Sequence, residues 1–344
     1  MMKQKMVMCL LAGVLVLGMS GCGAQEVEVP EVENVETAEE EPVPEETAEE
    51  EGDEQEKTDA EDQLKEVPTV DDAAESGKTE PEETEAASAP VVYEDGGQIT
   101  LDPSWTYADH SKINSGAAVL YKAAENRKEI VVGVNAGHGT SGGTKVKTLC
   151  HPDGSAKVTG GTTAAGATEA VAVSSGMTFN DGTPESSVTL RMAQILKEKL
   201  LAAGYDVLML RDGDDVQLDN VARTVICNNA ADCHIALHWD GDGLNYDKGC
   251  FYISVPDGLK SMEPVASHWQ EHDALGASLV EGLRTEGMTI YQNGSMNIDL
   301  TQTSYSTIPS VDMELGNASS DHSDSTLNSL ADGLTAGVNA YFGN

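Results

Sequence analysis

Short apolar runs alternate with longer amphipathic segments from residue 128 to the end of the chain. In 186–203 the apolar residues recur at helical spacing, and Gly204 follows where a helix would end. Residues 128–134 form a β-branched run, which is typical of a buried strand. The same criteria predict further strands at 206–211, 233–238, 250–255 and 310–315, and further helices at 217–231, 268–286 and 326–341. Strands separated by helices predict an α/β fold, in which a mostly parallel twisted sheet is flanked by helices.

The first 21 residues have the pattern of a signal peptide. Two lysines precede an apolar run at 6–18, which is too short to cross a membrane as a helix and has the usual length of a signal-peptide core. The residues Met19-Ser20-Gly21-Cys22 then resemble the lipobox of bacterial lipoproteins, although Met19 stands where Leu is usual. The resemblance implies that 1–21 is removed and that Cys22 carries lipid. The alternative is an ordinary secretory signal, and both interpretations predict an exported protein.

Acidic residues dominate the segment between the signal peptide and the predicted fold. Residues 26–95 hold 29 Asp and Glu against 3 Lys, with no Phe or Trp. Such a composition cannot bury enough apolar surface to offset the entropy of ordering, so we expect 22–95 to be a disordered linker. We favour a tether between the lipid and the folded domain, and the alternative is a recognition tail for a cationic partner.

The charge of the chain excludes two classes of protein. The whole sequence holds 20 Lys and Arg against 59 Asp and Glu, a formal net charge of -39. A basic surface for nucleic acid needs cations for its phosphate contacts, and a protein held on anionic lipid by Lys and Arg needs them as well. We therefore expect no nucleic-acid partner.

The sequence after the linker divides into an extension at 96–128 and a larger domain at 129–344. The extension contains one Trp and two Tyr, so we expect it to pack on the domain. The domain is long enough to bury one core, and we expect a monomer. Its cysteines can form disulfides in three pairings or remain buried thiols: Cys150, Cys227, Cys233 and Cys250.

Two histidines and two glutamates fall near the ends of the predicted elements, where a parallel sheet presents its functional residues. His138 follows the first strand and His238 ends a later one, while Glu185 opens a helix and Glu314 lies near the end of another strand. Two imidazoles and one carboxylate leave an open position on a tetrahedral zinc ion, as in catalytic sites. A second carboxylate could take a proton from the attacking water and deliver it to a leaving amine.

Four motifs in this order resemble the Amidase_3 family of zinc-dependent N-acetylmuramoyl-L-alanine amidases, which cleave the bond between glycan and stem peptide in peptidoglycan. The family's first strand and GHG motif are similar to IVVGVNAGHG, and its Glu-x-x-x-Asn-Leu helix start is similar to ESSVTL, with Thr189 in place of Asn. Its Arg…Asn…Ala-Asp…Ile-x-His block resembles ARTVICNNAADCHIALH, and its Pro-x-Val-x-x-Glu-x-Gly motif resembles PSVDMELG. The similarity covers about residues 129–342.

The resemblance implies a function and a role for each of these residues. It implies a single catalytic Zn²⁺ at the carboxyl ends of the strands, bound by His138, Glu185 and His238, with Glu314 as catalytic acid and base. Zinc-activated water would cleave the amide bond between N-acetylmuramic acid and the L-alanine of the stem peptide. Together with the lipobox, it implies an enzyme on the extracellular side of a bacterial membrane, anchored by lipid at Cys22.

The sequence departs from the family pattern at two places. The family has a short loop between its first His and its Glu, whereas here the 139–184 insertion separates the two residues and could be a lid, a wall of the substrate groove or a decoration. After the third ligand the family prefers Ala and Asn, but Trp239 and Asp240 follow here, which bears on substrate contacts more than on the metal.

Two other functions remain possible for the same chain. His268, Glu271 and His272 spell H-x-x-E-H, a zinc-protease motif in which both histidines share a helix face, but this alternative leaves the four motifs above unexplained. A non-catalytic cell-wall-binding module would be expected to lack a ligand or Glu314, and none is missing.

Three further residues compete for the metal site. His234 lies at the start of its strand, far from the carboxyl end, so we expect it to be packed in the core. His151 lies in the insertion and is a remote candidate, and Glu169 could rival Glu185 but lacks the Leu-rich helix that follows Glu185.

Overall fold

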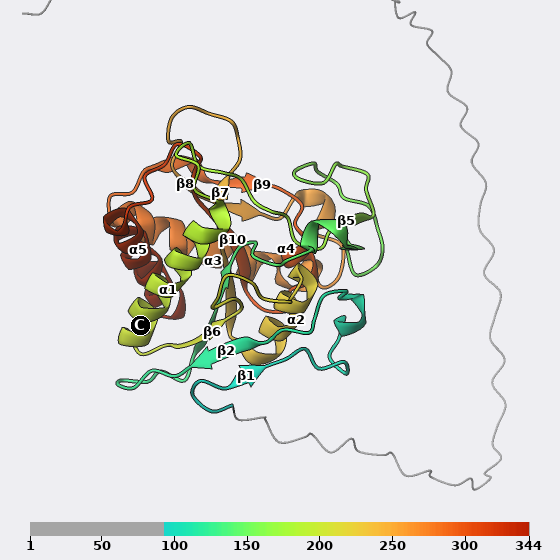
Figure 1. Cartoon of the computed structure of the whole chain (residues 1–344), viewed down its shortest axis with the longest axis horizontal. Coiled ribbons are helices and arrows are strands. Elements are labelled where there is room, and N and C mark those ends of the chain that lie inside the picture. The colour runs from blue at the N-terminus through green and yellow to red at the C-terminus, as the bar shows by residue number, and fades with distance from the viewer. Residues whose placement is uncertain (1–92, 344) are drawn as a thin grey trace, which may run out of the picture. The chain divides into compact units, whose positions relative to one another are not determined.

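The computed structural model describes residues 93–343 (Figure 1). The predicted signal peptide, the lipidation site at Cys22 and nearly all of the predicted linker lie outside the described residues. Within 93–343, none of the helices has the length and apolarity needed to cross a membrane.

An eight-stranded sheet forms the centre of the described residues. Its middle strands are apolar on both faces because helices cover both sides, and the four strands β6, β3, β7 and β10 run parallel. The outer strand pairs β2–β6, β1–β2 and β8–β10 are antiparallel, and β8–β9 is parallel. The prediction of a mostly parallel sheet flanked by helices is confirmed. In spatial order the strands are β1 (Gln98–Ile99), β2 (Ala118–Tyr121), β6 (Asp206–Met209), β3 (Val131–Ala136), β7 (Cys233–Asp240), β10 (Ser310–Asn317), β8 (Cys250–Ser254) and β9 (Ile290–Asn297).

Helices cover the two faces of the sheet unequally (Figure 1). The apolar faces of α1, α3 and α5 share one core with β3, β7 and β10, while α2 packs in a second core with β6 and the extension. The short helix α4 lies on the side of α2 and contacts it. The bounds are α1 (Glu185–Ala202), α2 (Asn220–Ala230), α3 (Val265–Thr285), α4 (Thr301–Tyr305) and α5 (Asp324–Phe342), with 3₁₀ turns η1 (Ala108–His110), η2 (Gly143–Lys145) and η3 (Asp257–Leu259).

The predicted elements are present, with shifted ends. β3 ends at Ala136, two residues before His138, and β7 continues to Asp240, two residues beyond His238. β9 was not predicted, because its sequence IYQNGSMN is largely polar and it lies at the edge of the sheet, where one side needs no partner.

The extension adds two strands to the sheet. Ile99 and Leu120 are buried in the same core as Leu208 of β6. Asp219 fixes the extension to α2, because its Oδ2 accepts hydrogen bonds from the backbone N–H groups of Lys112 (2.6 Å) and Ile113 (2.8 Å) while its Oδ1 caps the helix.

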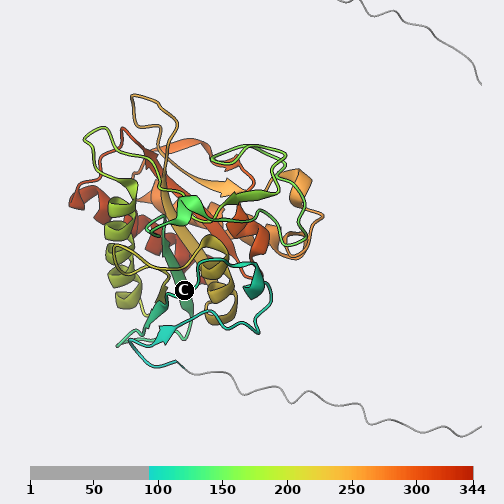
Figure 2. The same cartoon turned by 45° about the vertical axis from the view of Figure 1, so that its right-hand side comes forward.

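The 139–184 insertion forms a segment of its own beside the sheet. It contains a two-stranded antiparallel ribbon, β4 (Lys147–Leu149) with β5 (Glu169–Val171). In Figures 1 and 2 the insertion, drawn in green, extends over the end of the sheet where β3 leads into it. The insertion therefore connects β3 with α1, and it begins and ends next to two of the residues predicted to bind metal, His138 and Glu185.

Candidate active site

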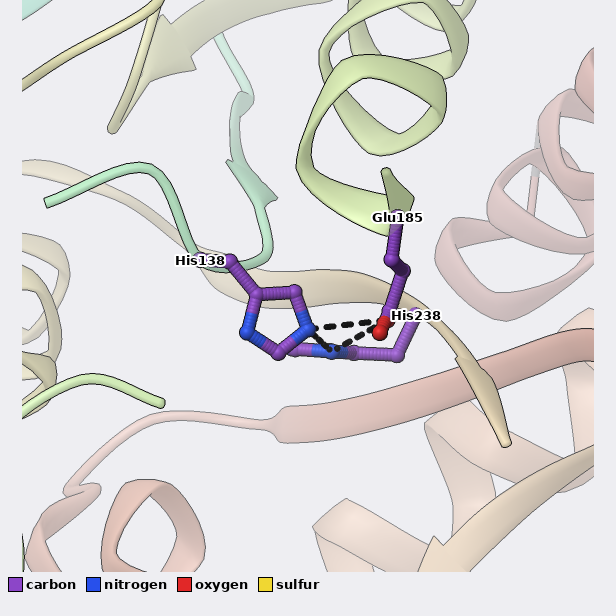
Figure 3. A group of neighbouring side chains, drawn as sticks. All are labelled: His138, Glu185 and His238. Atoms are coloured by element: carbon purple, nitrogen blue, oxygen red, sulfur yellow. Dashed lines mark hydrogen bonds and ion pairs between the residues drawn. The ribbon is translucent and has the colours of Figure 1, made fainter. Parts of the chain in front are cut away.

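His138, Glu185 and His238 meet at one end of the sheet, with their ring nitrogens and carboxylate directed at one another (Figure 3). His138 Nε2 lies 2.9 Å from Glu185 Oε1 and 3.0 Å from His238 Nδ1, and His238 Nδ1 lies 3.2 Å from Glu185 Oε1. Within residues 93–343 these three form the one group of His, Cys, Asp or Glu side chains arranged to hold a metal ion. Ligand atoms around a tetrahedral zinc ion are about 3.3 Å apart, given its bond lengths, so this donor set fits zinc.

Hydrogen bonds to the backbone orient two of the three, His138 and Glu185. The Nδ1–H of His138 donates to the carbonyl oxygen of Ser174 at 3.0 Å, which leaves Nε2 free to face the other two residues. Glu185 is the first residue of α1, and its carboxylate accepts from the backbone N–H groups of Met177 (2.8 Å) and Trp239 (3.0 Å). These contacts fix the donor atoms of His138 and Glu185, and the third donor, His238, lies on β7.

Two glycines permit the close approach of these side chains. A Cβ atom at Gly137 would lie 2.3 Å from His238 Cε1, so the first glycine of the GHG motif leaves room for the second imidazole. At Gly176 the backbone has a φ of +79°, and a Cβ there would lie 2.7 Å from Glu185 Oε2 and from His138 Cδ2.

The carboxylates and imidazoles of the site shift one another's pKa. Burial opposes ionisation of Glu185, but its bonds to the two imidazoles outweigh that effect and hold the pKa of this carboxyl well below its usual range. Burial likewise opposes charge on His238, yet the negative charge of Asp312, Glu185 and Glu314 raises its pKa to about 10. The carboxylates around His238 thus favour a positive charge at this position.

Glu314 and Asp312 project from β10 toward the same cavity. The register of β10 with β7 pairs Glu314 with His238, and Asp312 Oδ2 lies 3.7 Å from His238 Nε2. Burial raises the pKa of both carboxyls, and for Glu314 the charge of Asp312 adds to the effect. Glu314 was predicted from its motif, whereas Asp312 was not, although the alternation of side chains along a strand places it on the same face as Glu314.

A cavity of about 610 Å³ contains the predicted ligands, Glu314 and Asp312. The insertion forms part of its wall with Lys157, Thr162 and Thr163, and the segment from the end of β9 into the start of α4 contributes residues 298–302. The sequence left open whether the insertion is a lid, a wall of the substrate groove or a decoration, and in the structure it forms part of the cavity wall.

Asp299 joins these two parts of the wall. Its carboxylate is fully buried and contacts His151 Nε2 at 2.9 Å, while its Oδ2 accepts from the backbone N–H of Val158 at 2.7 Å. Lys157 donates to the backbone carbonyl of Asp299, and Thr159 Oγ1 accepts from its N–H at 2.8 Å. His151 therefore fastens the insertion in place and is not part of the metal-holding group.

The rival metal candidates lie elsewhere. On α3, the buried His272 accepts a hydrogen bond from the N–H of Ser310 at 3.0 Å, and His268 lies 3.5 Å from Glu271. This motif is thus engaged in packing and a surface pair. His234 is buried in the core, as predicted, and Glu169 is exposed on β5.

The residues after the third ligand have separate tasks. Trp239 is buried and packs edge-on against Phe179, with ring centroids 5.8 Å apart. Asp240 lines the cavity and forms an ion pair with Lys248. The four cysteines of the domain are buried free thiols: Cys150, Cys227, Cys233 and Cys250.

Comparison with known proteins agrees with the fold. The Amidase_3 family, described as N-acetylmuramoyl-L-alanine amidase, matches residues 132–338. Among solved structures, the chain resembles the N-acetylmuramyl-L-alanine amidase Ami1 of Mycobacterium smegmatis, with 19% identity and a TM-score of 0.52 over 64% of this chain and 99% of that one. It also resembles the apo form of Ami1 from Mycobacterium abscessus, with 20% identity and a TM-score of 0.50 over 62% and 99%. No curated protein matches the chain.

Proposed function

The chain belongs to the Amidase_3 family of N-acetylmuramoyl-L-alanine amidases, and on this premise we propose that His138, Glu185 and His238 bind its zinc ion and that Glu314 transfers the proton. As a member of the family the protein is a hydrolase of peptidoglycan. Its reaction separates N-acetylmuramic acid from the L-alanine of the stem peptide.

The close spacing of the three donor atoms is the observation that carries the metal assignment. His138 and Glu185 are fixed by contacts with the backbone, and the donor atoms of all three residues lie close around one central point. A zinc ion bound there supplies a Lewis acid for the scissile carbonyl and an activated water. The protein itself orients the imidazole of His138, lines the cavity and supplies the acid/base group.

The proposed role of Glu314 is to transfer the proton during hydrolysis, and its pairing with His238 and its place in the cavity lining support that role. Attack of water on the amide carbonyl forms a carbon–oxygen bond and releases a proton, and cleavage of the carbon–nitrogen bond requires a proton on the leaving amine of L-alanine. Glu314 takes the first proton and delivers the second. One of its carboxylate oxygens is buried without a hydrogen-bond partner in the described residues, so it is available for this exchange.

The assignment is tested by product analysis with matched variants. Purified protein is incubated with peptidoglycan, and the released fragments are identified by mass spectrometry. We expect free stem peptides beginning with L-alanine, lost after chelation, restored by zinc and absent with His138→Ala, while His268→Ala behaves like wild type. Cleavage between amino acids that depends on His268, or full activity of His138→Ala, would contradict the proposal.

We further propose that the enzyme is exported and held on the membrane by lipid at Cys22, followed by the acidic tether. The signal-like sequence and the lipobox support this, since the family's substrate lies outside the cytoplasm. Cys22→Ser should move the protein from the membrane fraction to the soluble fraction of cell lysates without changing its activity on isolated peptidoglycan. Retention in the membrane fraction would exclude the lipid anchor.

A further inference from the structure

Two buried arginines lie beneath the site without a carboxylate partner. Arg211 is 1% exposed and Arg223 is fully buried. Within residues 93–343 the ion pairs of arginine belong to Arg127, Arg191 and Arg284. Burying a guanidinium without a counter-charge costs free energy unless its N–H groups donate hydrogen bonds to other acceptors. The acceptors that these two side chains bind therefore indicate why the arginines are there.

Arg223 binds the backbone that carries His138. Its guanidinium donates to the carbonyl oxygens of His138 (2.7 Å), Ala136 (3.0 Å) and Leu218 (3.1 Å). It also donates to Asn135 Oδ1 and to Thr140 Oγ1, both at 2.9 Å. His138 has a φ of +66°, an uncommon conformation for a residue with a Cβ atom, and Arg223 holds its carbonyl on one side of that turn.

Arg211 connects the turn of His138 with the helix of Glu185. Its Nη2 donates to the carbonyl oxygens of Gly137 (3.0 Å) and Ser186 (2.8 Å), which neighbour the two predicted ligands in sequence. The same nitrogen donates to Thr189 Oγ1 at 2.9 Å, and Thr189 in turn donates to Gly137 O at 2.9 Å. One side chain thus ties the end of β3 to the first turn of α1.

We propose that Arg211 and Arg223 are positioning residues that fix His138 and Glu185 relative to each other before the metal ion binds. This inference rests on the proposed metal site. None of the hydrogen bonds described for the two arginines goes to the side chain of a predicted ligand or of Glu314. Each arginine therefore acts through the backbone at or beside a ligand. The planar guanidinium presents several N–H groups at fixed angles, which the single ammonium of lysine cannot reproduce.

The conservative substitutions Arg211→Lys and Arg223→Lys test the proposal in the whole protein. The zinc dissociation constant is measured by competition with a chromogenic chelator, and the ligand geometry by the visible absorption spectrum of the cobalt(II)-substituted protein. We expect zinc affinity to fall by about 10- to 100-fold in each variant and the cobalt spectrum to change, as for other residues that orient metal ligands. We also expect kcat to fall more than KM rises.

Arg127→Lys is the matched control, because it weakens a partly buried ion pair with Asp206 at the start of β3 and β6, whereas His138 follows the other end of β3. It should lower stability to denaturant and leave the zinc affinity and the cobalt spectrum unchanged. Unchanged zinc affinity and spectrum in both Lys variants, or equal effects from Arg127→Lys, would overturn the proposal.

Two further variants keep the test decisive. If a Lys variant does not fold, Thr189→Val removes one hydroxyl of the same link at similar volume and should weaken zinc binding in the same direction. Wild-type zinc affinity in Thr189→Val would then count against the proposal. His138→Ala separates the two hypotheses: if it still binds zinc at the active site, the metal assignment itself fails, whatever the arginine variants show.

Discussion

Asp312 and Glu314 lie two residues apart on β10, line the same cavity as His238, and each retains a buried carboxylate oxygen without a hydrogen-bond partner in the described residues. Such orphaned oxygens are costly in a structural element, and they are explained if the groups act on a ligand. Asp312 contacts His238, whereas Glu314 is the glutamate of the PSVDMELG motif. We therefore expect Asp312 to orient the imidazole and Glu314 to transfer the proton.

Glu314→Gln keeps the shape of the side chain and removes its ability to accept and return a proton. We expect kcat to fall by about 10²- to 10⁴-fold while zinc affinity is retained. Release of stem peptides measured against time gives kcat, and metal content is measured on the same sample. Glu271→Gln on the surface of α3 is the control and should be fully active. A Glu314→Gln enzyme with near wild-type kcat would exclude the acid/base role.

Asp312→Asn removes the negative charge beside His238 Nε2. Because a carboxylate partner orients a metal-binding imidazole and increases its basicity, we expect zinc affinity to fall by about 10- to 100-fold. Competition with a chelator measures the change. Asp332→Asn, which breaks a partly exposed pair with Lys199, should have no effect on zinc. Equal zinc affinities for wild type and Asp312→Asn would show that His238 is oriented without this contact.

Asp299→Asn should loosen the cavity wall without disturbing the metal site. The change leaves Lys157 and His151 with a weakened buried partner, and we expect local stability to fall by about 3 kcal/mol. Faster amide hydrogen exchange in 150–163 and a higher KM would report the loosened wall, with zinc affinity unchanged. Asp257→Asn, in an exposed pair with Lys260, is the control. Unaltered exchange in 150–163 would mean that other contacts hold the insertion.

His234 and His272 should make the fold sensitive to acid. Burial lowers the pKa of each to about 3, with nearby positive charge as a smaller cause: Arg223 and His272 for His234, and His268 for His272. The unfolded chain binds these protons at a pKa of about 6.5, so the stabilisation is complete above that pH and is lost as pH falls toward 3. At pH 5 the loss is about 2 kcal/mol per histidine.

Urea unfolding between pH 7 and pH 4 measures this loss of stability. His234→Leu removes one titrating group whose nitrogens have no hydrogen-bond partner in the described residues, so its stability should decline less with acid. His268→Gln, on a partly exposed residue, should leave the slope close to that of wild type. Parallel curves for His234→Leu and wild type would contradict the prediction.

The sequence sufficed for the central fold and for the candidate ligands because both follow from local patterns. Apolar runs predicted the parallel strands, and His138, Glu185 and His238 stand near element ends that a parallel sheet brings to one edge. The polar edge strand β9 escaped prediction, since half-exposed strands lack a continuous apolar pattern.

Long-range contacts account for most of what the sequence could not predict. His151 and Asp299 are 148 residues apart, and no periodicity relates them, so the insertion's place in the cavity wall emerged only from the structure. Arg223 stands inside a motif that resembles the family, but its target, the carbonyl of His138, depends on the pairing of β3 with β7.

The insertion begins at Gly139, directly after one candidate ligand, and ends at Pro184, directly before another. Those two ligands are held 2.9 Å apart at their side chains, so the attachment points of the insertion are fixed whatever lies between them. Doubling the length of such a loop costs only about 0.6 kcal/mol in closure entropy. This segment can therefore be exchanged for one of another length or sequence without moving the catalytic core. It is the place where a different substrate preference could be grafted onto the same core.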